Sequence, residues 1–459
     1  MGGEADNGFT GRCRAILPVE LAGGTDMMSW YREADDRTRR VFWTCGAGWA
    51  MDAADGQVYQ YLIPLLIGSL GLTLTEAGSI ASANYFAAAI GGWIGGWLCD
   101  RFGRARILQL TILWFSVFSF ASGFAQDYQQ LLVIRILHGI GFGAEWAVGA
   151  VLLGEIIAPR HRGKALGAVQ AGAPIGSGIA ALLAGPVAAM FPLDVGWRVA
   201  FWAGLLPALL IFFVRRGSDD SEIFKQARAR QSAARQSASI GAIFTPKVLG
   251  VTVLAALLSV GVQGGAYSVA NYLTAFLTQE RGLSQSTASY CVLVNSIGGF
   301  FGCFGNAYLS DHFGRRAVFR LSGIGFVVMA SIYLFGPWGG DIRFLIPIGL
   351  IYGCFQFGMY ASFGPYFTEL FPTELRGNGQ AFAYNFGRAA GSLFILAVAQ
   401  LSGVILLSAA MAILAITGMV LAILATFLLP ETAGRTLLSI DDLGEVSNAD
   451  GAANLEPAQ

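Results

Sequence analysis

The chain has 459 residues, of which 55% are hydrophobic and only 13% are Asp, Glu, Lys or Arg. Soluble proteins average about 25% of these four charged residues, so the composition excludes a disordered chain and a soluble enzyme of ordinary type. The 29 basic residues balance the 29 acidic ones, which leaves no net charge to attract a nucleic acid. The composition predicts an integral membrane protein that has no nucleic-acid partner.

Twelve apolar runs follow one another along the chain, each near the length of about 20 residues that a helix needs to cross the hydrocarbon core. The alternating pattern of barrel strands is absent from the sequence, so helices are the expected spanning elements. We therefore predict an all-α membrane protein with twelve transmembrane helices, at residues 41–63, 79–98, 107–125, 130–157, 164–190, 197–214, 247–277, 287–309, 317–336, 342–367, 378–401 and 404–429.

Lys and Arg are distributed unevenly between the two ends of these helices. Of the 29, 24 lie in the two tails, in the loops after even-numbered helices or at the helix ends beside those loops. Arg281 and Arg343 belong to the opposite side, and Arg135, Arg198 and Arg388 lie within helices or at their edges. Because cytoplasmic loops carry the excess of positive charge, we predict a multi-pass protein of the cytoplasmic membrane with both termini in the cytoplasm. Residues 1–40 contain no visible secretory signal peptide.

The longest polar stretch divides the chain into two halves of six helices. We expect a cytoplasmic tail at 1–40, a helix bundle at 41–214, a solvated linker at 215–246, a second bundle at 247–430 and a cytoplasmic tail at 431–459.

Two loop motifs recur in the second half of the chain, in the same order. Residues 100–104 read DRFGR, and residues 311–315, after the eighth helix, read DHFGR. Residues 155–163 read EIIAPRHRG, and residues 369–377 read ELFPTELRG. The halves are therefore parallel copies, a duplication typical of secondary transporters that bind substrate between the halves near the bilayer midplane.

These loop motifs resemble the hallmark of the major facilitator superfamily. The resemblance is narrowed by residues 196–198 (GWR), by residues 430–437 (PETAGRTL) and by residues 135–146 of the fourth helix, which read RILHGIGFGAEW. Together with Asp52 and Asp55, they make the chain similar to the metabolite:proton symporters, a group that includes sialic acid, aromatic acid and monocarboxylate transporters and is related to sugar porters. The resemblance implies two pseudo-symmetric bundles that alternate access to the substrate site.

The charges in the loop motifs predict a latch on the cytoplasmic side. A carboxylate there can pair with an arginine or face the positive N-terminal end of a helix. The resemblance implies that such contacts hold the halves together in the outward-open state; the alternative is that the charges only fix the topology. The predicted gating residues are Asp100, Arg101, Arg104, Glu155, Arg162, Asp311, Arg315, Glu369 and Arg376.

Four ionisable residues in the first and fourth helices are candidates for proton coupling, because a charge buried in the membrane is costly unless paired or hydrated. Asp52 and Asp55 lie three residues apart on one helix face, where two carboxylates repel and one takes up a proton more readily. The resemblance implies that Asp55 carries the proton and pairs with Arg135, with Asp52 as the rival carrier. A permanent buried ion pair is the alternative, and Glu145 is either a coupling or a packing residue.

Arg388 in the eleventh helix has no acidic residue within two turns on its own helix. A guanidinium in that position is a bidentate clamp for a carboxylate, unless it pairs with an acidic residue of another helix. Polar stripes at helical spacing predict the rest of the substrate path, against the alternative of interhelical hydrogen bonds. These candidate binding residues are Tyr384, Asn385, Gln263, Tyr267, Asn271, Gln356 and Tyr360. His138 is either a hydrogen-bonded packing residue or a proton relay.

The sequence therefore predicts a secondary active transporter that couples the entry of a small organic anion to protons. The alternatives are a proton-coupled sugar or polyol symporter and a transporter-like nutrient sensor. A nucleophile–base set, metal-ligand spacing and a nucleotide-binding loop are all absent from the sequence. We predict no enzymatic activity, no cofactor or metal, and a monomer whose partners are the substrate, protons and the lipid bilayer.

Overall fold

The computed structural model describes residues 31–32, 36–102, 104–156, 168–205, 240–372 and 375–433. Every regular element in these ranges is a helix. This confirms the predicted all-α class, and each of the twelve predicted spans overlaps an observed helix.

The first half of the chain contributes six helical spans. The fifth span is irregular: an α-helix passes into a π-helical segment that contains Gly185 and Pro186 and then into a 3-10 turn. The elements are α2 (Asp36–Leu70), α3 (Leu74–Phe102), α4 (Arg104–Ser122), α5 (Tyr128–Ile156), α7 (Gly172–Leu182) continued by η2 (Leu183–Val187) and η3 (Ala188–Met190), and α8 (Leu193–Ala203).

The second half contributes six more spans, preceded by a short 3-10 turn, η4 (Ile240–Phe244). Two of these spans are broken in a way that the apolar runs did not predict. The elements are α11 (Pro246–Ala270) with α12 (Leu273–Gln279), α13 (Gln285–Phe313), α14 (Arg315–Phe335), α15 (Ile342–Ala361) with α16 (Phe363–Leu370), α17 (Arg376–Leu401) and α18 (Leu407–Leu428).

The two breaks have local chemical causes. Pro365 in α16 lacks a backbone N–H and its ring collides with the carbonyl four residues earlier, which is that of Ala361, where α15 ends. At the other break, the side-chain amide of Asn271 donates to the carbonyl oxygen of Tyr267 at 3.0 Å. This bond occupies a carbonyl near the end of α11, where Tyr272 leaves helical geometry (ψ 4°).

Helix starts follow capping chemistry that is legible in the sequence. Before α3, the Glu76 carboxylate accepts the backbone N–H of Thr73 at 2.8 Å, and the Thr73 hydroxyl accepts that of Glu76 at 3.1 Å, as in a capping box. Ser284 accepts the N–H of Thr287 at the start of α13, and Asp341 accepts that of Arg343 at the start of α15. These caps satisfy amides that the first turn of a helix leaves unpaired.

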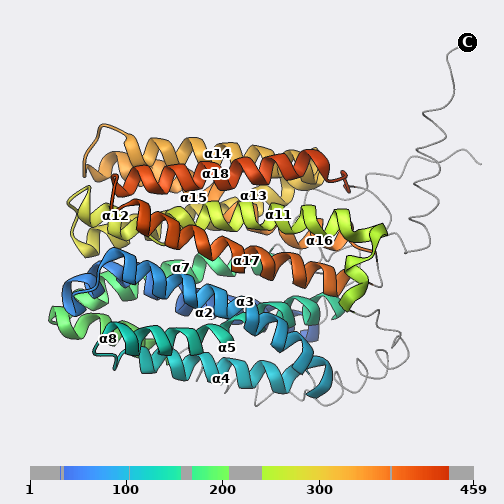
Figure 1. Cartoon of the computed structure of the whole chain (residues 1–459), viewed down its shortest axis with the longest axis horizontal. Coiled ribbons are helices and arrows are strands. Elements are labelled where there is room, and N and C mark those ends of the chain that lie inside the picture. The colour runs from blue at the N-terminus through green and yellow to red at the C-terminus, as the bar shows by residue number, and fades with distance from the viewer. Residues whose placement is uncertain are drawn as a thin grey trace, which may run out of the picture.

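The helices run alongside one another in two groups (Figure 1). In the N-terminal group α3 packs on α5 and α2 on α7, while in the C-terminal group α11 packs on α17 and α18, and α13 on α15. The two groups meet where α3 contacts α17 and where α7 contacts α13. Two pseudo-symmetric six-helix bundles therefore make up the fold.

The outer surface of the bundles is apolar, as a lipid-facing surface must be. Leu110, Phe301 and Leu424 are 60%, 63% and 56% exposed. Within the described part of the chain, seven helices are long and apolar enough to cross a membrane. The chain is a multi-pass membrane protein.

Glycines bring helices of one bundle into backbone contact. A β-carbon at Gly91 would collide with the carbonyl of Ile140, and one at Gly143 with that of Ala88. The glycine-rich stretches of α3 and α5 therefore serve helix packing, since small residues allow helices to approach closely in a membrane.

The two bundles are hydrogen-bonded at the end that the charge distribution predicts to face outward. The Thr274 hydroxyl donates to the carbonyl of Gln60 at 3.2 Å, and the Gln285 amide donates to that of Tyr61 at 2.8 Å. Deeper in the interface, the Ser296 hydroxyl on α13 donates to that of Ser177 on α7 at 2.8 Å. This end is closed by direct contact between the bundles.

Replacing Gly78 with Leu is expected to keep this end open. A β-carbon there would collide with the Tyr272 hydroxyl and approach the β-carbon of Ala399 at 2.7 Å, so α3 cannot meet α12 and α17. Spin-label distances across the outer end should lengthen, whereas Gly250→Leu, with no atom within 4 Å of its β-carbon, should leave them unchanged. Equal distances in the two variants would contradict this reading of the contact.

Candidate functional site

Helices α2, α4 and α5 meet at the buried carboxylate of Asp55, which is 3% exposed. One oxygen, Oδ2, lies 2.5 Å from Nε2 of His138 on α5, and the Ser119 hydroxyl on α4 donates to Oδ1. On the far side of the imidazole, Nδ2 of Asn84 on α3 lies 2.8 Å from Nδ1 of His138 and donates to the Arg135 carbonyl at 2.6 Å. We call Asp55, Ser119, His138 and Asn84 the Asp55 site.

Arg135 is buried beside this site, one turn before His138. Its guanidinium carbon lies 5.1 Å from the centre of the Tyr59 ring and 5.8 Å from that of Phe201. Nε and Nη1 of Arg135 have no hydrogen-bond partner among the described residues. In this structure the direct partner of Asp55 is therefore His138, and the predicted pair of Asp55 with Arg135 stays a prediction. Asp52, one turn before Asp55, is also buried, at 2% exposed.

Arg388 on α17 is the centre of a second buried group. It is 4% exposed, and its guanidinium carbon lies 5.2 Å from the centre of the Tyr384 ring. Tyr267, Tyr360 and Tyr85 lie within electrostatic range of it. We call these five residues the arginine–tyrosine cluster. Nε and Nη1 of Arg388 are buried without a hydrogen-bond partner in the described part of the chain, which leaves two donors for a ligand.

The cluster bridges the two bundles. The rings of Tyr85 on α3 and Tyr267 on α11 are stacked, with centroids 4.6 Å apart and planes 22° apart. Tyr267 donates to Oε1 of Gln263 at 2.9 Å, and Nε2 of Gln263 donates to the Tyr384 carbonyl at 2.9 Å. The predicted residues Gln263, Tyr267, Tyr360, Tyr384 and Arg388 therefore come together.

Of three other predicted binding residues, two lie against neighbouring helices and the third is bonded to its own helix. Asn385 packs towards Gly92 of α3, where an added β-carbon would lie 2.6 Å from Oδ1. Oε1 of Gln356 accepts from Nδ2 of Asn295 on α13 at 3.0 Å. Asn271 is bonded to the carbonyl of Tyr267. Their roles in binding stay predictions.

Phe142 joins the Asp55 site to the arginine–tyrosine cluster. Its ring is stacked on the imidazole of His138, with centroids 5.9 Å apart, and its centre lies 5.6 Å from the guanidinium carbon of Arg388. Gly56, directly after Asp55, makes room for it, since a β-carbon there would lie 2.9 Å from the Phe142 ring.

Four residues of these two groups were not predicted from the sequence: Phe142, Tyr85, Ser119 and Asn84. Phe142 follows His138 by four residues and so shares its helix face, which is a usable signal. Ser119 and Asn84 are ordinary small polar residues of apolar helices, and only their contacts with Asp55 and His138 identify them.

The gating residues that are described lie in one cluster within the C-terminal bundle, where two of them form an ion pair. Arg315 binds Glu369 through two hydrogen bonds, from Nε at 3.1 Å and from Nη2 at 2.9 Å. Nε of Arg376 donates to the Thr368 carbonyl at 2.7 Å. The side chains of the other gating candidates, and that of Glu145, lie outside the described residues: Asp100, Arg101, Arg104, Glu155, Arg162 and Asp311.

Glu431 closes this cluster at the N-terminus of α14. Its carboxylate accepts the backbone N–H groups of Arg315 and Arg316 at 2.8 and 3.0 Å, and those of Thr432 and Ala433 at 3.0 and 3.1 Å. Gly314 is required there, because its φ is 90° and a β-carbon would lie 2.8 Å from the carboxylate. Burial opposes ionisation of Glu431, but the four N–H donors outweigh it and hold the pKa below its ordinary value.

Replacing Glu431 with Gln is expected to lower the stability of the detergent-purified protein by about 1 kcal/mol, the value of a charged hydrogen bond reduced by solvent screening. Because the pKa of Glu431 is lower in the folded protein than its ordinary value of 4.5, the carboxylate stabilises the fold at pH values above 4.5. This stabilisation is lost as the pH falls through the pKa of the folded state. The difference in unfolding temperature between wild type and variant should therefore be larger at pH 7 than at pH 4. Glu280→Gln, which loses a bond to one N–H, should cost less; an equal loss would contradict the account.

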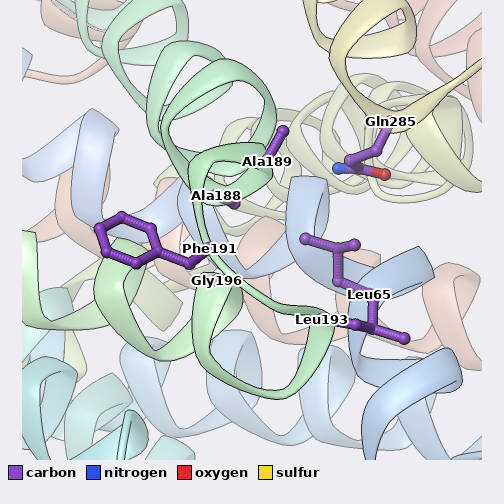
Figure 2. Close-up of a pocket in the computed structure, with 7 residues that line it drawn as sticks. All are labelled: Leu65, Ala188, Ala189, Phe191, Leu193, Gly196 and Gln285. Carbon is purple, nitrogen blue, oxygen red and sulfur yellow. The ribbon is translucent and has the colours of Figure 1, made fainter.

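An apolar pocket of about 180 Å³ lies at the predicted outer end of the N-terminal bundle. Figure 2 shows Gln285 reaching from α13 towards Ala189 and Leu65. Leu65 follows Asp55 by ten residues on α2, about 15 Å along the helix. The pocket is therefore separate from the Asp55 site. Its lining residues are Leu65, Ala188, Ala189, Phe191, Leu193, Gly196 and Gln285.

Residues 46–395 match the family model of the Major Facilitator Superfamily. The chain is 39% identical over 433 residues to a probable 4-methylmuconolactone transporter of Cupriavidus pinatubonensis, covering 94% of this chain and 99% of that one. It is 30% identical to the cis,cis-muconate transport protein of Acinetobacter baylyi, over 75% and 82% of the two chains. It is 28% identical to the 3-(3-hydroxy-phenyl)propionate transporter of Escherichia coli, over 70% and 76%.

Among solved structures, the chain is similar to the xylose transporter XylE from E. coli in a partially occluded inward-open conformation. The TM-score is 0.71 at 17% sequence identity, over 88% of this chain and 100% of that one. This likeness concerns the fold, and it confirms the twelve-helix architecture of two bundles.

Proposed function

The chain belongs to the Major Facilitator Superfamily of transporters, and on that premise we propose that it carries a small organic carboxylate across the cytoplasmic membrane together with protons. Family membership and the transporters among its relatives confirm that the chain is a transporter and not an enzyme.

The observation that carries the proposal is the pair of unused hydrogen-bond donors on the guanidinium of Arg388. Two of its donors are buried without a partner in the described part of the chain, and a buried donor left unsatisfied is costly. An organic carboxylate supplies both acceptors in the plane of the fork. The tyrosine rings of the cluster surround the guanidinium with aromatic surface against which a flat carbon skeleton can pack.

The relatives support the same chemical class. Muconate is a conjugated dicarboxylate and hydroxyphenylpropionate is an aromatic carboxylate, and proteins named for their transport are 30% and 28% identical to this chain. A planar anion is therefore the substrate that we propose for the arginine–tyrosine cluster.

Proton coupling is assigned to Asp55. It is the buried carboxylate that lies against a histidine and within electrostatic range of Arg135, so conformational changes of either neighbour alter its affinity for a proton. The bundles at 41–214 and 247–430 rock about the cluster to alternate access. We propose that the protein is a monomer with both termini in the cytoplasm. The linker at 215–246 joins the two bundles, and the tails are at 1–40 and 431–459.

A ligand panel on the purified protein tests the substrate class. Cis,cis-muconate, 3-(3-hydroxyphenyl)propionate, 4-methylmuconolactone and D-xylose are compared by thermal unfolding, since a ligand at 100 times its Kd stabilises by about 2.7 kcal/mol. At least one carboxylate is expected to raise the unfolding temperature of wild type but not of Arg388→Gln, and D-xylose is expected to have no effect. Stabilisation by D-xylose alone would identify a neutral-substrate symporter instead.

A further inference from the structure

The hydrogen-bond directions in the Asp55 site are fixed by one backbone carbonyl. The carbonyl of Arg135 only accepts, so the Asn84 atom 2.6 Å from it is the amide nitrogen. The same nitrogen lies 2.8 Å from Nδ1 of His138. Its second N–H therefore points at Nδ1, which must be the acceptor and carries no proton.

A neutral imidazole with a bare Nδ1 has its proton on Nε2. Nε2 lies 2.5 Å from Oδ2 of Asp55, so His138 donates to the carboxylate. Ser119 donates to the other oxygen. Both oxygens of Asp55 are thus acceptors, which is the arrangement of an ionised carboxylate.

We propose that His138 and Asn84 are positioning residues of the proton site: Asn84 fixes the Nε2–H tautomer of His138, and that N–H holds Asp55 in its ionised form until a proton arrives. This inference rests on the proposed function, in which Asp55 is the proton carrier. It goes beyond it by naming the residues that set when Asp55 is protonated.

The arrangement also determines which oxygen receives the proton. A proton on Oδ2 would face the proton on Nε2 of His138, and the imidazole cannot move its own proton to Nδ1 while Asn84 donates there. Oδ1 faces the hydroxyl of Ser119, which turns from donor to acceptor without moving its oxygen. The proton therefore enters on Oδ1, and the bond from His138 to Oδ2 weakens because the carboxyl is no longer charged.

The other groups around His138 leave this assignment intact. From α4, the Phe115 ring meets the imidazole edge-on at 6.1 Å, and from α5 the Phe142 ring stacks at 5.9 Å. Of the described charged groups, Asp55 on α2 and Arg135 on α5 act on His138 electrostatically. The Phe115 and Phe142 rings offer Nδ1 no hydrogen-bond donor or acceptor, so the tautomer deduced from Asn84 stands.

Infrared titration of the purified, full-length protein tests the proposal without a substrate. The intensity of the C=O band of protonated buried carboxyl groups is recorded as a function of pH. The portion of this band that is missing in Asp55→Asn belongs to Asp55, and the pH at which it reaches half its intensity is the midpoint. In His138→Leu the carboxylate loses its charged hydrogen bond, so the midpoint is expected to rise by about one pH unit or more. Asn84→Leu removes the donor that fixes the tautomer of His138, so it should raise the midpoint of Asp55 by less than His138→Leu does.

Two further variants distinguish a positioning role of His138 from a merely structural one. His138→Gln keeps an N–H near the place of Nε2 and should restore the wild-type midpoint, whereas the matched control His312→Leu, at an exposed histidine, should leave it unchanged. All samples are taken from monodisperse fractions, and His138→Gln and Asn84→Leu carry the test should His138→Leu fail to fold.

The outcomes are distinguishable. An Asp55 band with the same midpoint in wild type, Asn84→Leu and the His138 variants would overturn this inference alone. A midpoint in His138→Gln that moves as far as in His138→Leu would also overturn it, since the N–H would then be irrelevant. Absence of any Asp55-dependent band would remove Asp55 as the carrier, and the coupling part of the proposed function would fail together with this inference.

Discussion

Replacing Arg388 with Gln is expected to reduce uptake of the organic anion to near background while the amount of folded protein in the membrane stays the same. Two donors of this buried guanidinium have no described partner, and Gln can keep a polar group beside Tyr384 and Tyr267, so we expect the unliganded protein to fold. A carboxylate loses two charge-assisted bonds, about 3 kcal/mol or more, which weakens binding by more than about a hundredfold. Binding to purified, monodisperse variants gives the measurement.

Arg388→Lys keeps the charge but loses the planar fork that matches a carboxylate. We expect this variant to bind the carboxylate more weakly, with an apparent Kd raised about tenfold or more, which corresponds to about 1.4 kcal/mol. Its expression should be normal. Arg281→Gln is the matched control, because Arg281 is bonded to the Leu334 carbonyl at 2.7 Å, away from the cluster. Normal carboxylate affinity in Arg388→Gln would remove the main reason for proposing an anion.

Asp55→Asn is expected to abolish uphill accumulation while exchange of substrate across the membrane continues. Asn cannot take up a proton at this site, so the energy of the proton gradient no longer reaches the substrate, but the two bundles still alternate with substrate bound. Counterflow in proteoliposomes measures exchange, and uptake under an imposed proton gradient measures accumulation.

The rival carrier makes the opposite prediction. If Asp52 titrates instead, Asp55→Asn should still accumulate substrate and acidify the vesicle lumen, and Asp52→Asn should abolish both. Comparing the two variants in the same vesicles therefore assigns the proton to one carboxylate.

The contacts of Phe142 suggest how the two groups communicate. Asn84 and Tyr85 are consecutive residues of α3, the first in the Asp55 site and the second stacked on Tyr267 of the other bundle. Phe142 touches both His138 and Arg388. We therefore propose that a movement of His138 on protonation of Asp55 is passed through Phe142 to Arg388.

The fold was predictable because its determinants are local. Twelve apolar runs and the uneven distribution of Lys and Arg follow from the chemistry of the bilayer, and all twelve predicted spans overlap an observed helix. The breaks at Ala361 and Asn271 were missed because they lie within continuous apolar runs. The signal for the first, Pro365, is visible in the sequence; the second depends on the side-chain bond of Asn271.

The site was predictable only in part, because charge is visible in a sequence and contact is not. Asp55, Arg135 and Arg388 were identified as charged residues at membrane depth, and the structure buries all three. The direct partner of Asp55 was not predictable, since His138 is 83 residues away along the chain. Spacing on one helix likewise cannot reveal that Asn385 packs towards Gly92 of α3.

The central claim is that carboxylate entry is coupled to proton entry, and uptake into proteoliposomes tests it most directly. Labelled cis,cis-muconate and 3-(3-hydroxyphenyl)propionate are supplied outside, with and without a proton gradient directed inward, and lumenal pH is recorded in the same vesicles. The account predicts that at least one of these anions accumulates above its external concentration only with the gradient, and that its entry acidifies the lumen. Accumulation that ignores the gradient, or entry of D-xylose with no carboxylate transported, would contradict it.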